Sequence, residues 1–201
     1  MNLRRTVLYF ERAGSSNTVS VIEAVEERLS LRDTRLVIVP MTTGRTAQLF
    51  SERLKEKAEV IPISEDDAIS ACKRIAQSDK GLLGSIVRSR LEEASESAYR
   101  RVRREIFDMT FLPFCGEVWT AVKETLYSFG QGMKVAIEIS VAAVETGKVK
   151  PYTKVIAVGG TGEGVDTAIV SRTSTQREAF SESPEKRLIV QEIIAMPTQK
   201  Y

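Results

Sequence analysis

The stretch VIVPMTTGRTAQLF, residues 37–50, decides the fold. Its apolar first part is typical of a buried strand and stops at Pro40, and its second part has the spacing of an amphipathic helix. The turn between them combines hydroxyl, glycine and arginine side chains: Thr42, Thr43, Gly44, Arg45 and Thr46. A helix cap, a tight turn and a seat for an anion each explain that composition.

Strands and helices alternate on both sides of this turn. The sequence predicts strands over residues 6–11, 35–41 and 58–64, and helices over 18–31, 45–57 and about 65–77. Such alternation indicates a mostly parallel sheet with helices on both faces. Three more strand-like segments follow near the C-terminus, at 153–160, 165–172 and 187–197. We therefore predict one three-layer α/β domain over residues 1–201, with antiparallel edge strands among the last two segments.

Apolar residues at helical spacing predict which helix faces are buried. In the first two helices these residues are Val19, Ile22, Val25, Leu29, Ala47, Leu49, Phe50 and Leu54. Asn17 or Thr18 is the expected cap of the first helix. Two later helices, over 116–130 and 133–147, are expected to end at glycines, Gly130 and Gly147. The last helix should bury Val135, Ile139, Ala142 and Ala143.

The middle of the chain is rich in charge. Residues 82–106 have helical apolar spacing with arginine and glutamate between, and residues 107–115 are typical of a strand. A long solvated helix with mixed-charge pairs explains the first segment, and a contact between protomers of a homo-oligomer is the second interpretation. Mixed charge without interleaved aromatic residues argues against a nucleic-acid partner.

Composition excludes several classes of site. The 201 residues are 42% hydrophobic, which is enough for a core. The net charge of +2 is too balanced to indicate a polyanion or a membrane as partner. No apolar run approaches the about 18 residues of a membrane span. Cys72 and Cys115 are far apart, as is typical of a reduced, cytoplasmic protein. The sequence contains no histidine, so we expect neither a histidine-based triad nor a metal site.

A second informative stretch is VIAVGGTGEGVDTAIV, residues 155–170. Its glycines, Gly159, Gly160, Gly162 and Gly164, would let backbone N–H groups approach a ligand closely. The segment lacks the helix of a dinucleotide fingerprint and the Lys-Ser/Thr of a Walker A loop. A tight hairpin and an anion-binding turn both remain as interpretations.

Both loops are predicted at the carboxyl ends of strands, where open α/β sheets bind ligands. An anion there would meet Thr42–Thr46, with Arg45 as a charged fork, and the turn Gly159–Gly164, which includes Thr161. Asp166 and Thr167 would face the same crevice, and Asp166 could accept from a sugar hydroxyl. Asn17 and Thr18 would line the other wall. The alternatives are a turn carboxylate for Asp166 and a helix cap for Asn17 and Thr18.

Residues 25–55 and 150–172 resemble two segments of the C-terminal α/β domain of pyruvate kinases, whose turns hold a sugar bisphosphate in some members. The kinase's catalytic barrel has no counterpart here, so kinase activity is not implied. The whole chain is more similar to a small, mostly archaeal family of stand-alone proteins named for that domain. The shared residues are Tyr9, Phe10, Gly14, Asn17, Thr18 and the segment from Val155 to Ala168. The family carries a glycine-containing loop where this chain has the acidic stretch 64–75.

The resemblance implies a protein that binds flavin mononucleotide (FMN), with no established reaction. We therefore predict a phosphate-containing ligand, with FMN as the leading cofactor and flavin redox chemistry that needs no histidine. The alternative is a regulatory module that senses a phosphorylated metabolite and acts through oligomer contacts. A carboxylate- or lysine-dependent hydrolase or transferase ranks last, because the sequence shows no paired-carboxylate pattern.

Overall fold

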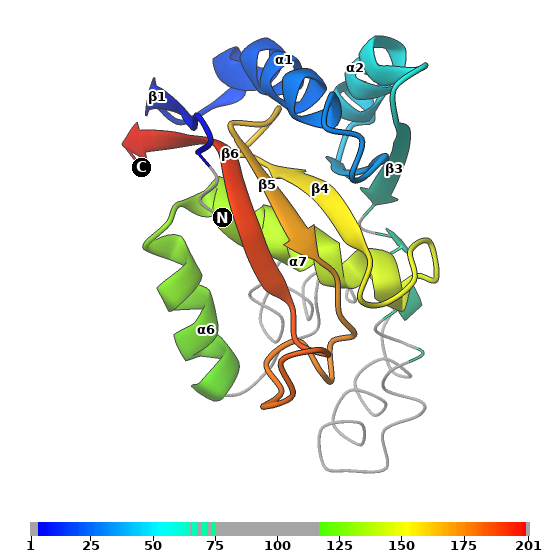
Figure 1. Ribbon diagram of the computed structural model, residues 1–201. Helices are drawn as coiled ribbons and strands as arrows, with labels where there is room; N and C mark the ends of the chain where they lie inside the picture. Colours follow the sequence, from blue (N-terminus) through cyan, green and yellow to red (C-terminus); the bar gives the residue numbers. More distant parts are fainter. Residues whose placement is uncertain (1–3, 65, 68–69, 72–73, 75–116, 200–201) are drawn as a thin grey trace.

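The computed structural model describes residues 4–64, 66–67, 70–71, 74 and 117–199 (Figure 1). In chain order its first elements are β1 (Leu8–Arg12), the short 3-10 helix η1 (Ser15–Asn17), α1 (Thr18–Leu29), β2 (Leu36–Met41), α2 (Arg45–Leu54) and β3 (Glu59–Ser64). The second group is α6 (Glu117–Tyr127), α7 (Gln131–Glu145), β4 (Lys154–Gly159), β5 (Thr167–Arg172) and β6 (Ile189–Gln199). The segments predicted over 82–106 and 107–115, with Cys72 and Cys115, lie outside the described residues.

The described strands form one six-stranded sheet in the order β1-β6-β5-β4-β2-β3. Within it β5 is antiparallel to both neighbours, and the β1–β6, β2–β3 and β2–β4 pairs are parallel. The prediction of a mostly parallel sheet is therefore confirmed. Antiparallel pairing near the C-terminus is also confirmed, since β5 runs against β4 and β6. The predicted edge position is wrong, because β1 pairs with β6 and leaves both β5 and β6 inside the sheet.

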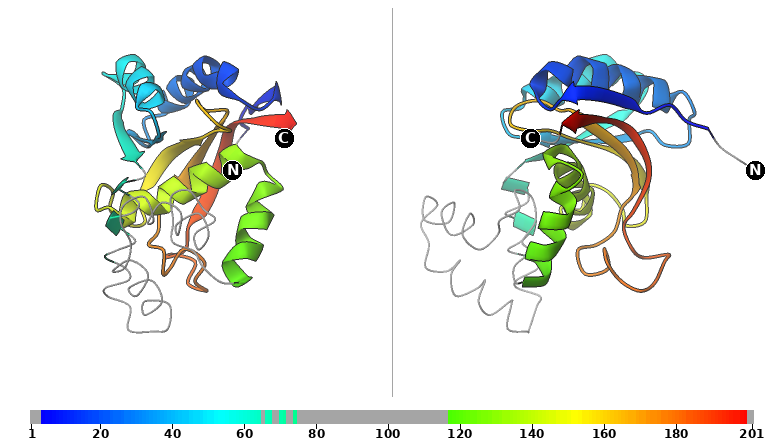
Figure 2. Two further views of the ribbon diagram at one scale, coloured as in Figure 1. Left: turned by 180° about the vertical axis from the view of Figure 1, so that it is seen from behind. Right: turned by 90° about the vertical axis from the view of Figure 1, so that its left-hand side faces the viewer.

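Helices cover both faces of the sheet, so the predicted three layers are present (Figure 2). One core lies between the sheet and helices α1 and α2, and includes Val25, Phe50 and Ile156. The other lies between the sheet and α7, and includes Ile139, Val155 and Ile169. Helix α6 packs against α7 on its outer side (Figure 1).

Most predicted helix faces are buried, with two exceptions. Ile22, Val25 and Leu29 are buried in α1, and Ala47, Phe50 and Leu54 in α2. Val19 and Leu49 are exposed, so their prediction as core residues is wrong. The buried face of α1 is centred on Val21 and Val25, which leaves Val19 on its flank.

Helix α7 is buried on nearly every side. Its predicted face is buried, and so are Lys134 and Glu138, one turn apart, whose Nζ and Oε1 atoms lie 3.2 Å from each other. Gly147 ends the helix with φ 76°, and the N–H groups of Gly147 and Lys148 donate to the carbonyls of Val144 and Ala143, a Schellman motif.

Gly130 has a different role from the one predicted. Helix α6 ends at Tyr127, and Gly130, with φ 99°, is the N-cap residue of α7. The first residues of α7, Gln131 and Gly132, thus precede the predicted start at residue 133. The correction matters because it places the N-terminus of α7 beside the end of β4.

The helix predicted after β3 is supported where the structure describes it, because residues 66–67, 70–71 and 74 are helical. Ser64 begins it with a capping box: the Ser64 hydroxyl accepts from the Asp67 N–H, and the Asp67 carboxylate accepts from the Ser64 N–H at 2.9 Å. The acidic stretch therefore caps a helix at this strand end.

Candidate functional site

The two loops predicted to carry the chemistry meet at one edge of the sheet. β2 and β4 are parallel neighbours, with Val37 opposite Ile156, so their carboxyl ends coincide. The turn Thr42–Gly44 follows β2, and the glycine turn 160–166 follows β4. The N-terminus of α7 reaches the same edge, since Gly132 packs against Gly159.

A cavity of about 380 Å³ opens between these three segments. Its walls include these predicted site residues: Thr42, Thr43, Gly44, Thr46, Gly160, Gly162 and Gly164. Four further residues line it that the sequence analysis did not select: Pro40, Gln131, Val135 and Glu163. The arrangement joins the two loops in one site and adds α7 as a third wall.

The turn after β2 leads directly into α2. Gly44 is the N-cap residue, with φ 84°, a left-handed conformation that favours glycine. Its carbonyl accepts the N–H of Gln48 at 2.9 Å, the first bond of the helix. Among the described residues, none accepts the N–H groups of Arg45, Thr46 or Ala47. These donors and the positive end of the helix dipole are therefore available to a ligand.

The threonines of this turn do not cap the helix, because a glycine occupies that position. Thr42 and Thr43 are exposed and Thr46 is half-buried. All three line the cavity, where their hydroxyl groups can donate to an anion. The cap interpretation of their presence is wrong for this structure, and the turn and anion-seat interpretations remain.

Close packing of glycines brings α7 to the cavity. A Cβ atom at Gly159 would lie 2.0 Å from the carbonyl oxygen of Gly132, and one at Gly132 would lie 2.2 Å from Thr167 Oγ1. Only glycine fits at these two contacts. As a result Gln131 and Val135, in the first turns of α7, form part of the cavity wall.

Asp166 lies beneath the glycine turn. It is fully buried, and its carboxylate accepts the Gly14 N–H and the Thr167 hydroxyl, each at 2.9 Å. Thr167 is also buried. Neither residue is part of the cavity lining that the structure describes. These bonds favour the turn-carboxylate interpretation, in which Asp166 joins the β1–α1 turn to the β4–β5 turn.

The side chains of Thr18 and Asn17 also bond backbone groups. The buried Thr18 hydroxyl donates to the Ser15 carbonyl at 2.8 Å and accepts the Val165 N–H at 3.1 Å. Asn17 Nδ2 donates to the Arg12 carbonyl at 2.8 Å, and its side chain makes no cap bond to α1. The described contacts place Thr18 under the glycine turn and Asn17 in the preceding loop, with neither on the cavity wall.

Three other predicted residues lie outside the described lining. Gly159 is buried in β4, Thr161 is exposed at the tip of the turn, and Arg45 is exposed on the first residue of α2. The cavity instead carries an acid, Glu163. Its position between Gly162 and Gly164 is visible in the sequence, but a carboxylate is not a donor to an anion, so the pattern gives no reason to expect it in a phosphate site.

No family model matches the sequence. Within the described residues, no group of three or more acidic or cysteine side chains is arranged to hold a metal ion. No helix in the same part of the chain is both long and apolar enough to cross a membrane.

Proposed function

We propose that the cavity binds a phosphate-containing ligand, with FMN as the leading candidate. One observation carries the proposal: two helix N-termini and a glycine turn open on the same cavity. The ends of α2 and α7 direct unbonded N–H groups and positive dipole ends toward this edge, which suits an anion.

The threonine side chains complete the proposed phosphate seat. Thr42 and Thr43 stand before the N-cap glycine and Thr46 stands in the first turn of α2, so hydroxyl donors surround the free N–H groups. Hydrogen bonds to a charged acceptor are worth about 1.5–3 kcal/mol each, roughly twice as much as neutral ones. A phosphate group can therefore bind here without a lysine or arginine on the wall.

FMN as the ligand rests on the resemblance to the stand-alone family related to pyruvate kinase. A bound flavin would supply the redox chemistry of an oxidoreductase, and the chain would supply the phosphate seat and the walls. Pyruvate kinase activity is not part of the proposal.

One observation favours the alternative, a regulatory module for a phosphorylated metabolite. No aromatic side chain lines the cavity among the described residues, so none of them stacks on a flavin ring. A sugar phosphate needs no such stacking and would use the same phosphate seat.

Titration of FMN into the purified protein tests the proposal. Binding would quench flavin fluorescence and shift the absorption bands, and Thr46→Val, which deletes one hydroxyl of the seat, should weaken it. The matched control is Thr125→Val, because Thr125 is exposed on α6 and bonds only its own helix among the described residues. Absence of FMN binding, with binding of a sugar phosphate in a thermal-shift screen, would replace the flavin by the regulatory ligand. No response to any phosphate compound would contradict both.

A further inference from the structure

From the position of Glu163 we infer that the site prefers a ligand with a single phosphate, whose hydroxyl-bearing remainder faces this carboxylate, over a bisphosphate. The inference rests on the proposed phosphate site and names its ligand class. It also departs from the resemblance, since the related turns of some pyruvate kinases hold a sugar bisphosphate.

The charges around the cavity carry the argument. Glu163 lines the same cavity as Thr42–Gly44 and Gln131, and no lysine or arginine lines it among the described residues. The two helix ends, each equivalent to about half a positive charge, would partly offset the charge of one phosphate and leave little for a second. A second phosphate in a cavity of about 380 Å³ would face the Glu163 carboxylate, and like charges at close range repel.

The backbone holds Glu163 in place despite its exposure. It stands between Gly162 and Gly164, which have φ values of 73° and 82°. A Cβ at Gly164 would lie 2.6 Å from Thr18 Oγ1, so this side of the turn is packed against the start of α1. Directly after Gly164, the Val165 N–H donates to the Thr18 hydroxyl, and the Asp166 carboxylate accepts the Gly14 N–H. The turn is thus anchored next to the carboxylate.

A sugar or ribityl chain carries the hydroxyl donors that suit the Glu163 side of the cavity. Its hydroxyl groups can donate to the Glu163 carboxylate and exchange hydrogen bonds with the Gln131 amide. A carboxylate that accepts such bonds favours neutral donors over a second anion, which is a source of specificity rather than of affinity alone.

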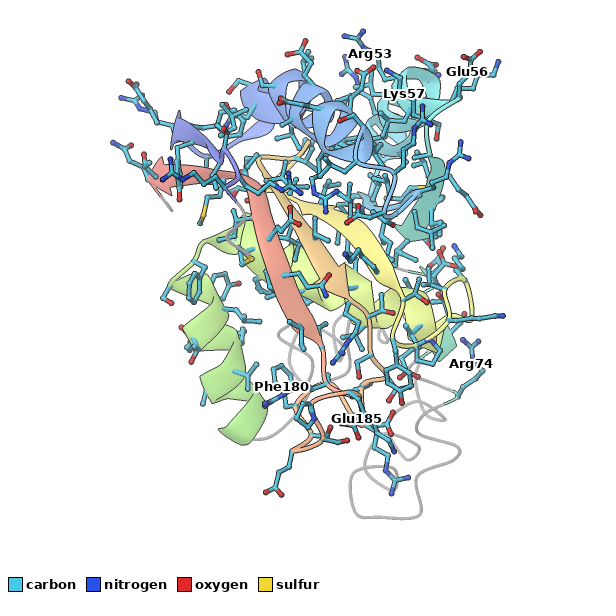
Figure 3. The ribbon with its side chains drawn as sticks, viewed as in Figure 1. Arg53, Glu56, Lys57, Arg74, Phe180 and Glu185 are labelled. Carbon is cyan, nitrogen blue, oxygen red and sulfur yellow. The ribbon has the colours of Figure 1, made fainter. Side chains whose placement is uncertain are left out.

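Isothermal titration with a matched pair of probes, ribose 5-phosphate and ribose 1,5-bisphosphate, tests the inference in buffer with EDTA. We expect the monophosphate to bind about fivefold more tightly, the modest ratio typical of an exposed charge. Glu163→Gln keeps an acceptor and removes the charge, so it should abolish the preference by strengthening bisphosphate binding. Glu182→Gln is the control, because Glu182 is exposed on the β5–β6 loop at the opposite edge of the sheet, where Figure 3 labels Phe180 and Glu185.

The outcomes separate the two proposals. Equal or tighter binding of the bisphosphate by the unmodified protein would overturn the inference while supporting the phosphate site. An unchanged ratio in Glu163→Gln would do the same. Failure of both probes and of FMN to bind would overturn the site itself.

Discussion

Polar groups cluster at both the amino and the carboxyl edge of the sheet, where the parallel strands begin and end. At the amino edge they bond one another, and at the carboxyl edge they are left unbonded by the described residues. At the amino edge Arg28 is buried, and its guanidinium bonds Asp33 and Glu192 through Nε, Nη1 and Nη2 at 2.7–3.0 Å. Lys154, the first residue of β4, adds a 3.1 Å contact to Asp33. At the carboxyl edge the helix N–H groups and threonine hydroxyls face a cavity, and no described residue accepts a hydrogen bond from them.

This difference separates groups that hold the fold from groups that can bind. The Arg28 network joins the end of α1, the loop before β2 and β6, and its charges satisfy one another. The cavity has donors that no described residue uses, and the buried residues beneath it, Thr18 and Asp166, satisfy the backbone that supports it. Stability should therefore depend on the network and the supporting layer, and binding on the cavity.

Arg28→Leu should have the largest effect on stability. The substitution takes the closest cation away from both Asp33 and Glu192, a change that costs about 3–5 kcal/mol when the pair is buried. We expect the lower end because Asp33 is partly exposed and keeps its contact with Lys154. Urea unfolding monitored by circular dichroism measures it. The control is Arg53→Leu, since Arg53 is exposed near the outer end of α2 (Figure 3). A loss below about 1 kcal/mol, as for a surface ion pair, would show that the network is not structural.

Asp166→Ala should destabilise next most. It leaves the Gly14 N–H and the Thr167 hydroxyl without their acceptor in a buried position, at a cost of about 2 kcal/mol. The matched control, Asp66→Ala, removes an exposed carboxylate. Unfolding in urea gives both values. Unchanged stability together with lost phosphate binding would instead make Asp166 a ligand residue.

Much of this architecture could be predicted from the sequence because it follows from local pattern. Apolar runs and helical spacing specify the alternation of strands and helices, and hence the layers. Strand order could not be predicted in the same way. Nothing in LYFER, residues 8–12, indicates that it pairs with β6, because that partner lies 187 positions away in the register Leu8–Ala195.

In the site, too, local features could be predicted from the sequence and features that depend on tertiary packing could not. Residues with backbone roles, such as Gly44 and Gly160, could be predicted because few other residues suit a positive φ or a close approach. The distinction between Asp166 and Glu163 could not, because both are acids in one short turn. One is buried by a bond to Gly14, far away in the sequence, and the other lines the cavity. Only tertiary packing separates them.

The Arg28 network should also make stability depend on pH. Hydrogen bonds from Arg28 lower the pKa of Glu192 below its ordinary value of 4.5, and lower that of Asp33 below 3.8. The folded pKa values lie below the unfolded ones, so the stabilisation is complete above about pH 5 and is lost as the pH falls through the folded values. Urea unfolding at pH 7 and pH 3 should show a smaller pH-dependent loss in Arg28→Leu. Equal losses in both proteins would assign the acid sensitivity to other carboxylates.

The smallest expected effects concern the two neighbours Arg45 and Thr46, which test the cavity directly. Thr46 lines it and Arg45 does not, although an arginine is the stronger anion ligand by chemistry alone. Thr46→Val should therefore weaken phosphate binding by about 1.5 kcal/mol, the lower end of the range for a hydrogen bond to a charged acceptor. Arg45→Ala should weaken it by less than about 1 kcal/mol, through a screened charge whose effect vanishes at high salt. Titrations of both variants with FMN or ribose 5-phosphate at low and high ionic strength measure the difference. A larger, salt-resistant loss in Arg45→Ala would place its guanidinium on the bound anion and would require α2 to rearrange on binding.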